Sequence, residues 1–474
     1  MVPLKEEPLT PQSFADEIEA AFWRDVVDAW FPACIDARGG FHQNFDRQWR
    51  PTEDKERFLV FQTRMIWLAS TVSELGGRRK EEFAAYARHG VRYLAERMFE
   101  PASGACYGAV DLEGQPFGHF ATHRETYGLA FAVFGLAAAS RVLKDDQALG
   151  MAKAVFTYLE TCHRDGEHGG YFECTDANGV PVLVGAESPG SDFPFRRKSQ
   201  NSHLHLLEAF TELYRVWRTP LVGKRLRDMV SMFCGEFYGE PGHLHMYLDL
   251  ESKPIEGSVT FGHDVEVAHL LDAALEVLGA KKHEQAVLSA AKQIQADPSQ
   301  AWLLRGTAET VGIPPFQFSR AFKDVTGTGF HPFVDLCRGG TAVRTVPETI
   351  RRYVDHSLQN GWDQEGGGFY ALRKHEGDID RTKIWWVQAE GLLALAVLFR
   401  ETGSEKYWHA LLDQWNCIKR HQIDSEWRGL FEAMGADGVP LGRLNKGHRW
   451  KAGYHDGRAF LFVPQILRKL TRRA

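Results

Sequence analysis

Two histidines lie in sequence settings that suit acid–base chemistry. His263 lies in the segment 261–266 (FGHDVE), and His455 lies in the glycine-rich segment 450–458 (WKAGYHDGR). Glu266 follows His263 by three residues, so both would share a helix face, and the carboxylate could orient the imidazole and hold its tautomer. Because histidine titrates near neutral pH, both histidines are candidates for taking and returning a proton. The plainer interpretation of His263 is a capping group at the start of a helix.

The same stretch also permits a metal-site interpretation. His263, Glu266 and His269 recur at intervals of three residues, and histidine with carboxylate is a common ligand set for transition metals. These residues span nearly two helical turns, however, and further ligands such as His203 or His205 would have to come from another segment. The seven cysteines are well spaced and contain no C-x-x-C pair. We therefore expect no bound metal.

Other residues could bind an anionic oxygen or a polyol. Arg64 is a single cation among apolar neighbours in the segment 61–67 (FQTRMIW). Unless a carboxylate pairs with it, this arginine suits an anion or a developing negative oxygen. Trp386 precedes Glu390 by four residues, so an indole face and a carboxylate would lie side by side for a polyol. Further polar or aromatic residues near the starts of predicted inner helices are Asn201, His205, Tyr127 and Trp450.

A short marker recurs six times along the chain and indicates how these residues are positioned. It consists of a glycine or small residue, one or two aromatic residues, an aspartate and then a proline, as in segments 39–51 and 169–181. Asp-Gly, Asn-Gly and proline are typical of hairpin turns. Each marker therefore predicts a short strand and a hairpin. The other four begin at Cys106, Gly242, Gly367 and Gly429, and the tail of the fifth is looser.

Between the markers the chain has the periodicity of paired helices. Segments 128–143, 203–217 and 388–399 are apolar on most faces, as expected of inner helices, whereas 81–98 is amphipathic and suits an outer ring. Six helix pairs, each with a hairpin, predict an all-α fold, a closed (α/α)6 barrel; an open solenoid is the alternative. Because six inner helices would point the same way, polar residues at their starts would gather at one mouth.

The interval between the fourth and fifth markers is much longer than the others and indicates an insertion. We place the barrel domain at residues 1–280 and 345–474, and the insert at 281–344. Within the insert, the segment 308–338 reads as helices joined at Gly312. This segment resembles the helix-turn-helix of AraC-type regulators.

In such a motif the recognition helix would span residues 315–325. The insert is mildly basic within a chain of net charge -6. AraC-type proteins use two such motifs, however, and only one is visible here. A single module that neutralises few phosphates binds DNA weakly at physiological salt. A decorative helical insertion is the alternative. The candidate DNA-contact residues are Gln317, Arg320 and Lys323.

Composition narrows the class of protein. The chain has 474 residues, of which 44% are hydrophobic and 25% charged, as in soluble globular proteins. No run of apolar residues is long enough to predict a membrane span, and the amino terminus lacks the apolar core of a signal peptide. We expect a cytoplasmic monomer or homodimer with reduced cysteines. The negative net charge disfavours a surface that binds polyanions as a whole.

The motifs together resemble the N-acylglucosamine 2-epimerase superfamily, and within it the cellobiose 2-epimerases in particular. The resemblance covers nearly the whole chain outside the insert. Its motifs are specific for the superfamily and much less specific for the sugar. It rests on the segments 39–41, 63–67, 201–209, 261–266, 385–390 and 450–458.

This resemblance implies an (α/α)6 barrel that acts on a reducing mono- or disaccharide without a metal or nucleotide cofactor. His263 and His455 would be the acid–base pair, and Arg64 would lie near the reactive oxygens. The opened sugar would lose its C2 proton to one histidine and form an enediolate, which the arginine stabilises. By the same resemblance, four residues would bind sugar hydroxyls or support the two bases: Asn201, His205, Glu266 and Glu390. Trp386 and Trp450 would stack on sugar rings.

Departures from the family pattern leave the substrate open. Glu125 and Leu129 stand where cellobiose 2-epimerases carry a histidine and a glutamine, and Gly453 and Asp456 replace a usual proline and asparagine. A monosaccharide isomerase of the mannose or sulfoquinovose isomerase type fits as well. Two further alternatives are a glycoside hydrolase that uses two carboxylates, and a sugar-sensing regulator that binds DNA through the insert. The carboxylates of the hydrolase would be Glu266 and Glu390.

Overall fold

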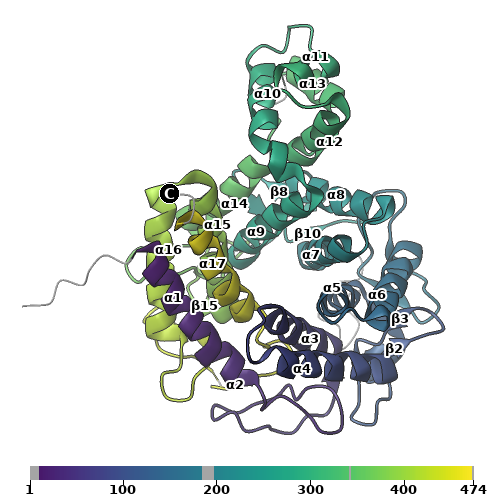
Figure 1. Cartoon of the computed structure of the whole chain (residues 1–474), viewed down its shortest axis with the longest axis vertical. Helices are drawn as coiled ribbons and strands as arrows, with labels where there is room; N and C mark the ends of the chain where they lie inside the picture. Colours follow the sequence, from purple (N-terminus) through teal and green to yellow (C-terminus); the bar gives the residue numbers. More distant parts are fainter. Residues whose placement is uncertain (1–9, 184–196, 341–342, 443, 472–474) are drawn as a thin grey trace, which may run out of the picture.

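A closed double ring of helices dominates the computed structural model, which describes residues 10–183, 197–340, 343–442 and 444–471 (Figure 1). In this part of the chain six helices form the inner ring and six the outer ring. The inner helices are α3 (Leu59–Glu74), α5 (Thr126–Leu143), α7 (Gln200–Val216), α9 (Phe261–Leu278), α15 (Trp385–Thr402) and α17 (His455–Thr471). The outer helices are α1 (Pro11–Ala21), α4 (Lys80–Tyr93), α6 (Asp146–Tyr158), α8 (Pro220–Cys234), α14 (Val346–Asn360) and α16 (Glu405–Cys417).

The sequence of each helix suits its layer. In α5 every residue from Thr126 to Ser140 is buried, because the helix is enclosed by neighbours on all sides. This helix is long and apolar enough to cross a membrane, but 83% of it is buried inside the molecule. Several outer helices begin at capping residues, and Thr10, Thr219 and Thr345 accept hydrogen bonds from backbone N–H groups of the first turn.

Contacts between the first and last repeats close the ring. Trp67 of α3 packs edge-to-face against Tyr454, with ring centroids 5.4 Å apart. The backbone of Phe45 pairs with Gly447, and the Phe45 N–H donates to the Gly447 carbonyl at 3.1 Å. The predicted (α/α)6 barrel is therefore confirmed, and the open-solenoid alternative is wrong.

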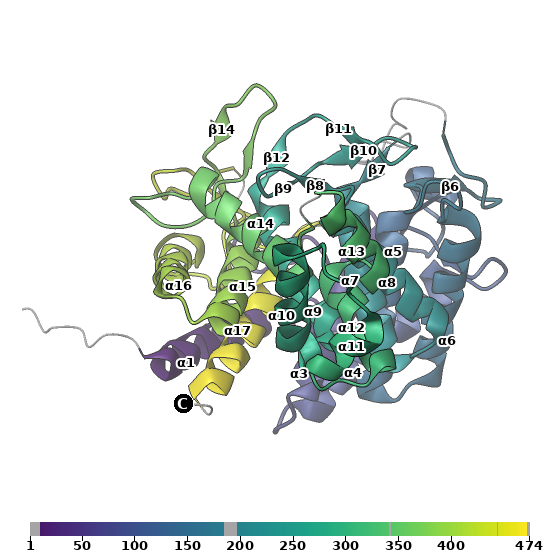
Figure 2. The same ribbon diagram turned by 90° about the horizontal axis from the view of Figure 1, so that it is seen from above.

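Short antiparallel strands join consecutive repeats at one end of the barrel (Figure 2). The strand that leads into an inner helix pairs with a strand of a later repeat, as β5 does with β6 and β15 with β16. The predicted hairpins are present, for example as the bridges between Thr175 and Pro181 and between Met434 and Pro440. The strands are β1 (Arg57–Phe58), β2 (Phe99–Glu100), β3 (Ala105–Cys106), β4 (Ala109–Val110), β5 (His123–Glu125), β6 (Cys174–Asp176), β7 (Lys198–Ser199), β8 (Tyr238–Gly239), β9 (His243–Leu244), β10 (Tyr247–Leu248), β11 (Pro254–Ile255), β12 (Val259–Thr260), β13 (Leu372–Arg373), β14 (Ile379–Asp380), β15 (Lys383–Ile384) and β16 (Ala433–Met434).

Buried lysine–aspartate pairs recur where the hairpins meet the inner helices. Lys198, which is fully buried, donates to Asp165 at 2.8 Å and to three further oxygens. Lys383 binds Asp363 at 2.7 Å in the equivalent place. These two pairs fix β7 and β15, the strands that immediately precede α7 and α15, and therefore the positions of those two helix starts.

The segment between α9 and α14 forms a small helical lobe that projects from the ring (Figure 1). A cluster of phenylalanines, including Phe318, Phe322 and Phe333, fills its interior. An ion pair between Arg227 of α8 and Asp324 joins the lobe to the barrel. The helices of the lobe are α10 (Glu284–Ala296), α11 (Leu304–Thr310), α12 (Pro315–Thr326) and α13 (Phe330–Arg338).

The three candidate DNA-contact residues lie on α12 and are exposed. Gln317 and Lys323 lie on the same side of the helix as Arg320, as their spacing requires. The Arg320 guanidinium, however, donates to the Tyr214 hydroxyl of α7 at 3.2 Å. One of the three side chains is thus already engaged by the barrel.

We expect Lys198→Met to lower the free energy of unfolding by about 3 kcal/mol or more, because it leaves a buried carboxylate without its cation. Urea denaturation monitored by circular dichroism measures this change. Lys253→Met is the matched control, because that lysine pairs with Glu251 on the surface, and it should leave the midpoint unchanged. Equal midpoints for both variants would contradict the structural role of the buried pair.

Candidate active site

The starts of the inner helices bring the predicted site residues together at the hairpin end of the barrel. Each residue lies in the first turns of its helix or immediately before it, so parallel inner helices present them at one mouth. These residues are Arg64 on α3, Tyr127 on α5, Asn201 and His205 on α7, His263 and Glu266 on α9, Trp386 and Glu390 on α15, and Trp450 and His455 at the start of α17.

The two candidate catalytic histidines both lie close to one indole. The ring centroid of Trp386 lies 4.9 Å from that of His263 and 5.7 Å from that of His455. The indole is tilted by 34° and 40° against the two imidazoles. Residues that are far apart in the chain therefore come together beside one apolar ring surface.

The ring of His263 is held through its Nδ1 atom. The Thr260 hydroxyl, 2.8 Å from this nitrogen, can accept its N–H, and the Gln200 amide donates to the same hydroxyl at 3.0 Å. In this tautomer Nε2 carries no proton and is left for a substrate. Burial, followed by the nearby His205, lowers the pKa of His263 to about 3. The ring is therefore neutral at working pH and can accept a proton.

Glu266 does not orient His263, and this corrects the expectation from their spacing. Its carboxylate binds Arg458 at 2.5 Å instead. The guanidinium is a stronger partner than a neutral imidazole, because the ion pair is buried and charge-assisted. Glu266 also lies 3.8 Å from Nδ1 of His455, so it belongs to the surroundings of the other histidine.

A buried guanidinium surrounded by three carboxylates lies beneath the histidines. Arg458 donates to Glu208, to Glu266 and, at 2.6 Å, to Glu390. Burial and the neighbouring Glu390 raise the pKa of Glu266. Burial alone would also raise the pKa of Glu390, but Arg458 and hydrogen bonds with two histidines hold it well below its usual range. Glu390 is therefore the carboxylate that stays charged.

His455 is anchored by this charged carboxylate. Its Nδ1 lies 2.6 Å from Oε1 of Glu390, so the ring donates Nδ1–H to Glu390 and keeps Nε2 available. Burial lowers the pKa of His455 to about 3, although the carboxylate opposes this shift. A neutral imidazole with a carboxylate behind it is an arrangement typical of a general base.

The spacing of Glu266, Glu390 and His455 would also suit a metal ion, since their ligand atoms lie within 4.8 Å of one another. Nη2 of Arg458 lies 2.5 and 2.6 Å from the two carboxylates. The guanidinium thus occupies the place of a cation between these groups.

Arg64 is positioned for an anionic oxygen. It donates to the Trp450 carbonyl at 2.8 Å and to the Tyr127 hydroxyl at 3.1 Å. Its guanidinium lies over the Phe131 and Tyr454 rings, 4.5 and 4.9 Å from their centroids. Among the described residues no carboxylate lies within ion-pair distance of it, so its charge remains available for a ligand.

Helix α7 carries two of the predicted site residues, Asn201 and His205, and a structural histidine, His203. Nδ1 of His205 lies 3.2 Å from Oε2 of Glu208, and its ring is 5.0 Å from Tyr127. Asn201 is only half-buried. His203 instead accepts a hydrogen bond from the backbone of Tyr171 and is a structural residue.

Sequence reasoning missed the charged layer that supports the histidines. Arg458 and Glu208 both lie inside the quoted motifs, and Arg458 follows His455 by three residues on one helix face, which was a usable signal. Tyr454 donates to both oxygens of Glu208 at 2.5 Å. The sequence indicates His269 only as a possible metal ligand, whereas in the structure its ring hydrogen-bonds with Glu390.

Comparisons with known proteins identify the family of the chain. The family model of N-acylglucosamine 2-epimerase matches residues 39–310 and 335–456. The chain belongs to the N-acylglucosamine 2-epimerase family. The part that the model leaves unmatched between these ranges lies within the helical lobe. The predicted family and the class of carbohydrate epimerases and isomerases are thus confirmed.

Relatives of this family resemble the chain over nearly its full length. The cellobiose 2-epimerase of Bacteroides fragilis is 25% identical over 446 residues, which are 93% of this chain and 96% of the relative. The D-mannose isomerase of Marinomonas mediterranea is 20% identical and covers 93% of this chain and 94% of its own. The solved cellobiose 2-epimerase of Spirochaeta thermophila has the same fold, with a TM-score of 0.75, 24% identity and coverage of 97% and 98%.

Removal of the central guanidinium should destabilise the protein in a pH-dependent way. We expect Arg458→Met to lower the free energy of unfolding by about 3–5 kcal/mol, because it leaves buried carboxylates uncompensated. The folded-state pKa values of these carboxyls would then exceed the unfolded values. The variant should therefore lose further stability as pH rises above the ordinary glutamate pKa.

Urea denaturation at pH 5 and pH 8 measures this effect. Arg50→Met is the control, since that arginine is exposed and pairs only with Asp46. A variant of Arg458 that is as stable at pH 8 as at pH 5, relative to the unsubstituted protein, would show that the carboxylates do not depend on the guanidinium.

Proposed function

We propose that this protein interconverts a reducing sugar with its C2 epimer or the corresponding ketose through an enediolate. The observation that carries the proposal is that His263 and His455, from distant parts of the chain, lie close to the same indole, Trp386. Two bases that approach one carbon from different sides are what epimerisation at that carbon requires. Arg64 supplies an unpaired cation at the same mouth.

The reaction begins with the ring-opened sugar, whose aldehyde makes the C2 proton acidic. The free Nε2 of one histidine takes this proton, and the C2–H electron pair forms the double bond of the enediolate. The negative charge develops on the carbonyl oxygen, where Arg64 stabilises it. Tyr127, hydrogen-bonded to Arg64, lies beside the same oxygens.

The return of the proton decides the product. Glu390 favours the protonated form of His455, so this ring can hold a proton while the enediolate forms. If the second histidine gives such a proton to C2 from the opposite face, the 2-epimer forms. If the proton returns to C1, the ketose forms. In both cases the enediolate electron pair becomes a C–H bond. In the epimer the C1 carbonyl is restored, whereas in the ketose the proton of the C2 hydroxyl passes to O1 and the carbonyl forms at C2, so no oxidant or reductant takes part.

The proposed substrate is a reducing mono- or disaccharide. Relatives include proteins described as cellobiose 2-epimerases and others described as D-mannose isomerases, and these two classes are the leading candidates for this chain. Glu125, which departs from the cellobiose 2-epimerase pattern, lies 2.8 Å from Nε2 of His119. Gly453, another of the four departures, lies so close to Trp30 that a Cβ atom would be 2.7 Å from its ring.

The hydrolase and regulator alternatives have less support. A glycoside hydrolase needs two carboxyl groups on opposite sides of the scissile bond, whereas Glu266 and Glu390 share one nitrogen of Arg458. A DNA-binding regulator needs Arg320, which the barrel engages. We also keep as proposals a cytoplasmic location, in line with seven free cysteines, and a monomer or homodimer.

Incubation with a panel of reducing sugars in D2O tests the proposal. We expect deuterium at C2 of the 2-epimer, with or without a ketose, detected by NMR and mass spectrometry. His263→Asn and His455→Asn should each lower interconversion by at least about 100-fold. Each variant should still exchange the C2 proton of the one epimer that the remaining histidine can reach.

His409→Asn is the matched control, because His409 is exposed on α16, and it should leave the activity unchanged. Full interconversion in both catalytic variants would contradict the two-base mechanism. Cleavage of a glycosidic bond, without any deuterium at C2, would favour the hydrolase alternative.

A further inference from the structure

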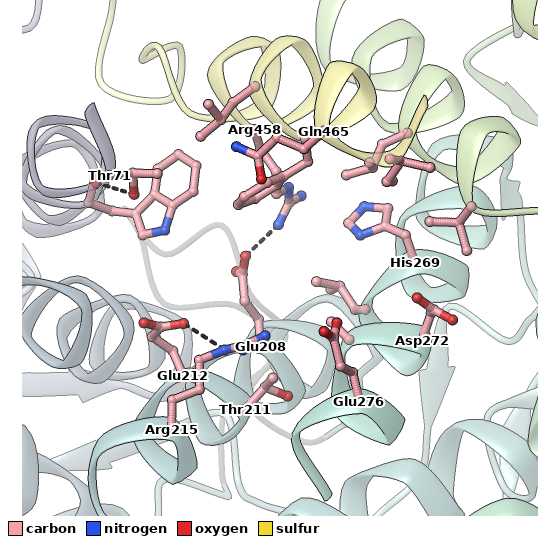
Figure 3. A pocket seen from close by; sticks show the side chains of 18 of the residues that line it. Thr71, Glu208, Thr211, Glu212, Arg215, His269, Asp272, Glu276, Arg458 and Gln465 are labelled. Atoms are coloured by element: carbon pink, nitrogen blue, oxygen red, sulfur yellow. Dashed lines mark hydrogen bonds and ion pairs between the residues drawn. The ribbon is translucent and has the colours of Figure 1, made fainter. Parts of the chain in front are cut away.

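A second pocket opens at the opposite end of the barrel, where the inner helices finish. It encloses about 720 Å³ and is lined by side chains from the later turns of these helices (Figure 3). Three of its lining residues, Glu208, His269 and Arg458, belong to the charged layer beneath the catalytic histidines. This opposite pocket and the candidate active site therefore contact the same layer of charged side chains.

The Glu390 carboxylate contacts one residue of the opposite pocket and one residue of the candidate active site. Oε2 of Glu390 lies 2.5 Å from Nε2 of His269, which lines the opposite pocket. Oε1 of the same carboxylate lies 2.6 Å from Nδ1 of His455. Glu390 is completely buried, and His269 is 5% exposed, so each carboxylate oxygen is tied to a different imidazole.

We propose that His269 is a positioning residue for the reaction at the other mouth: it holds one oxygen of Glu390 from the opposite pocket and thereby sets how strongly Glu390 binds His455. This inference rests on the function proposed above. Burial lowers the pKa of His269, so its ring is neutral and donates Nε2–H to the carboxylate. A carboxylate that accepts this bond has less negative charge to offer His455, which makes His455 a weaker base and a better acid.

The other charged groups around Glu390 do not replace its hydrogen bond with His269. Arg458 on α17 contacts Glu390 at Oε1, the same oxygen that binds His455. Glu266 on α9 and Glu208 on α7 both bind Arg458, and Arg64 on α3 lies on the substrate side. Among the described residues, His269 is the hydrogen-bond partner of Oε2.

A pair of substitutions separates the hydrogen bond from the packing. His269→Phe keeps a ring of similar size but removes the donor, and His269→Gln keeps an N–H donor near the position of Nε2. In His269→Phe the whole Glu390 charge acts on His455, so we expect the acid limb of the kcat/KM profile to move up by about one pH unit. We expect kcat to fall while KM stays the same, because His269 does not touch the sugar. His269→Gln should retain the original profile.

A measurement without substrate keeps this inference separate from the proposed function. With 15N-labelled histidine, NMR should show that the pKa of His455 rises in His269→Phe and not in His269→Gln; comparison with His455→Asn assigns the signal. Gln465→Ala is the control, because it widens the opposite pocket without contacting Glu390, and it should change nothing. If His269→Phe does not fold, His269→Asn, whose amide is too short to reach Glu390, takes its place.

The inference is overturned if His455 titrates identically in all variants, or if the donor-free variant changes KM alone. If the unsubstituted protein exchanges no sugar proton but the NMR shift is seen, the proposed function fails and the positioning role stands. If sugars react and the NMR shift is absent, the proposed function stands and the positioning role of His269 fails.

Discussion

The buried cluster around Arg458 is the interaction on which the candidate active site depends. One guanidinium inside the barrel neutralises part of the charge of three carboxylates that come from three different inner helices. Each carboxylate in turn holds or neighbours a histidine, as Glu208 does His205 and Glu390 does His455. Taking so many charges out of water is tolerated only because nearly every one has a partner, so the positions of the helices and the protonation of the bases are set together.

The barrel supplies this cluster by repetition. Each repeat places a hairpin before an inner helix, and pairing of that hairpin with the following repeat fixes where the helix starts. The helix starts therefore converge at one mouth, and so do the partial positive charges of their free N–H groups. A negative enediolate at this mouth meets a favourable field, to which Arg64 adds a full charge. At the opposite mouth lie the carboxyl-terminal ends of the inner helices and several charged side chains. The pocket there contacts the same Arg458 cluster.

Much of this architecture could be predicted from the sequence, because it depends on local patterns. Hairpin markers, apolar inner helices and polar residues at helix starts all have short-range signatures, and they predicted the barrel and the set of residues at its mouth. Which polar groups pair with one another depends on contacts between distant helices. Glu266 was therefore assigned to His263 from its spacing, although the structure pairs it with Arg458. Thr260 and Gln200, which hold His263, had no signal beyond adjacency to known motifs.

The most direct test of the account is a crystal structure with an acyclic sugar alcohol bound, as a stand-in for the opened sugar. The account predicts C2 of the ligand between Nε2 of His263 and Nε2 of His455, on opposite faces, with an oxygen of the ligand on Arg64. A ligand whose C2 is approached by only one of the two imidazoles would contradict it.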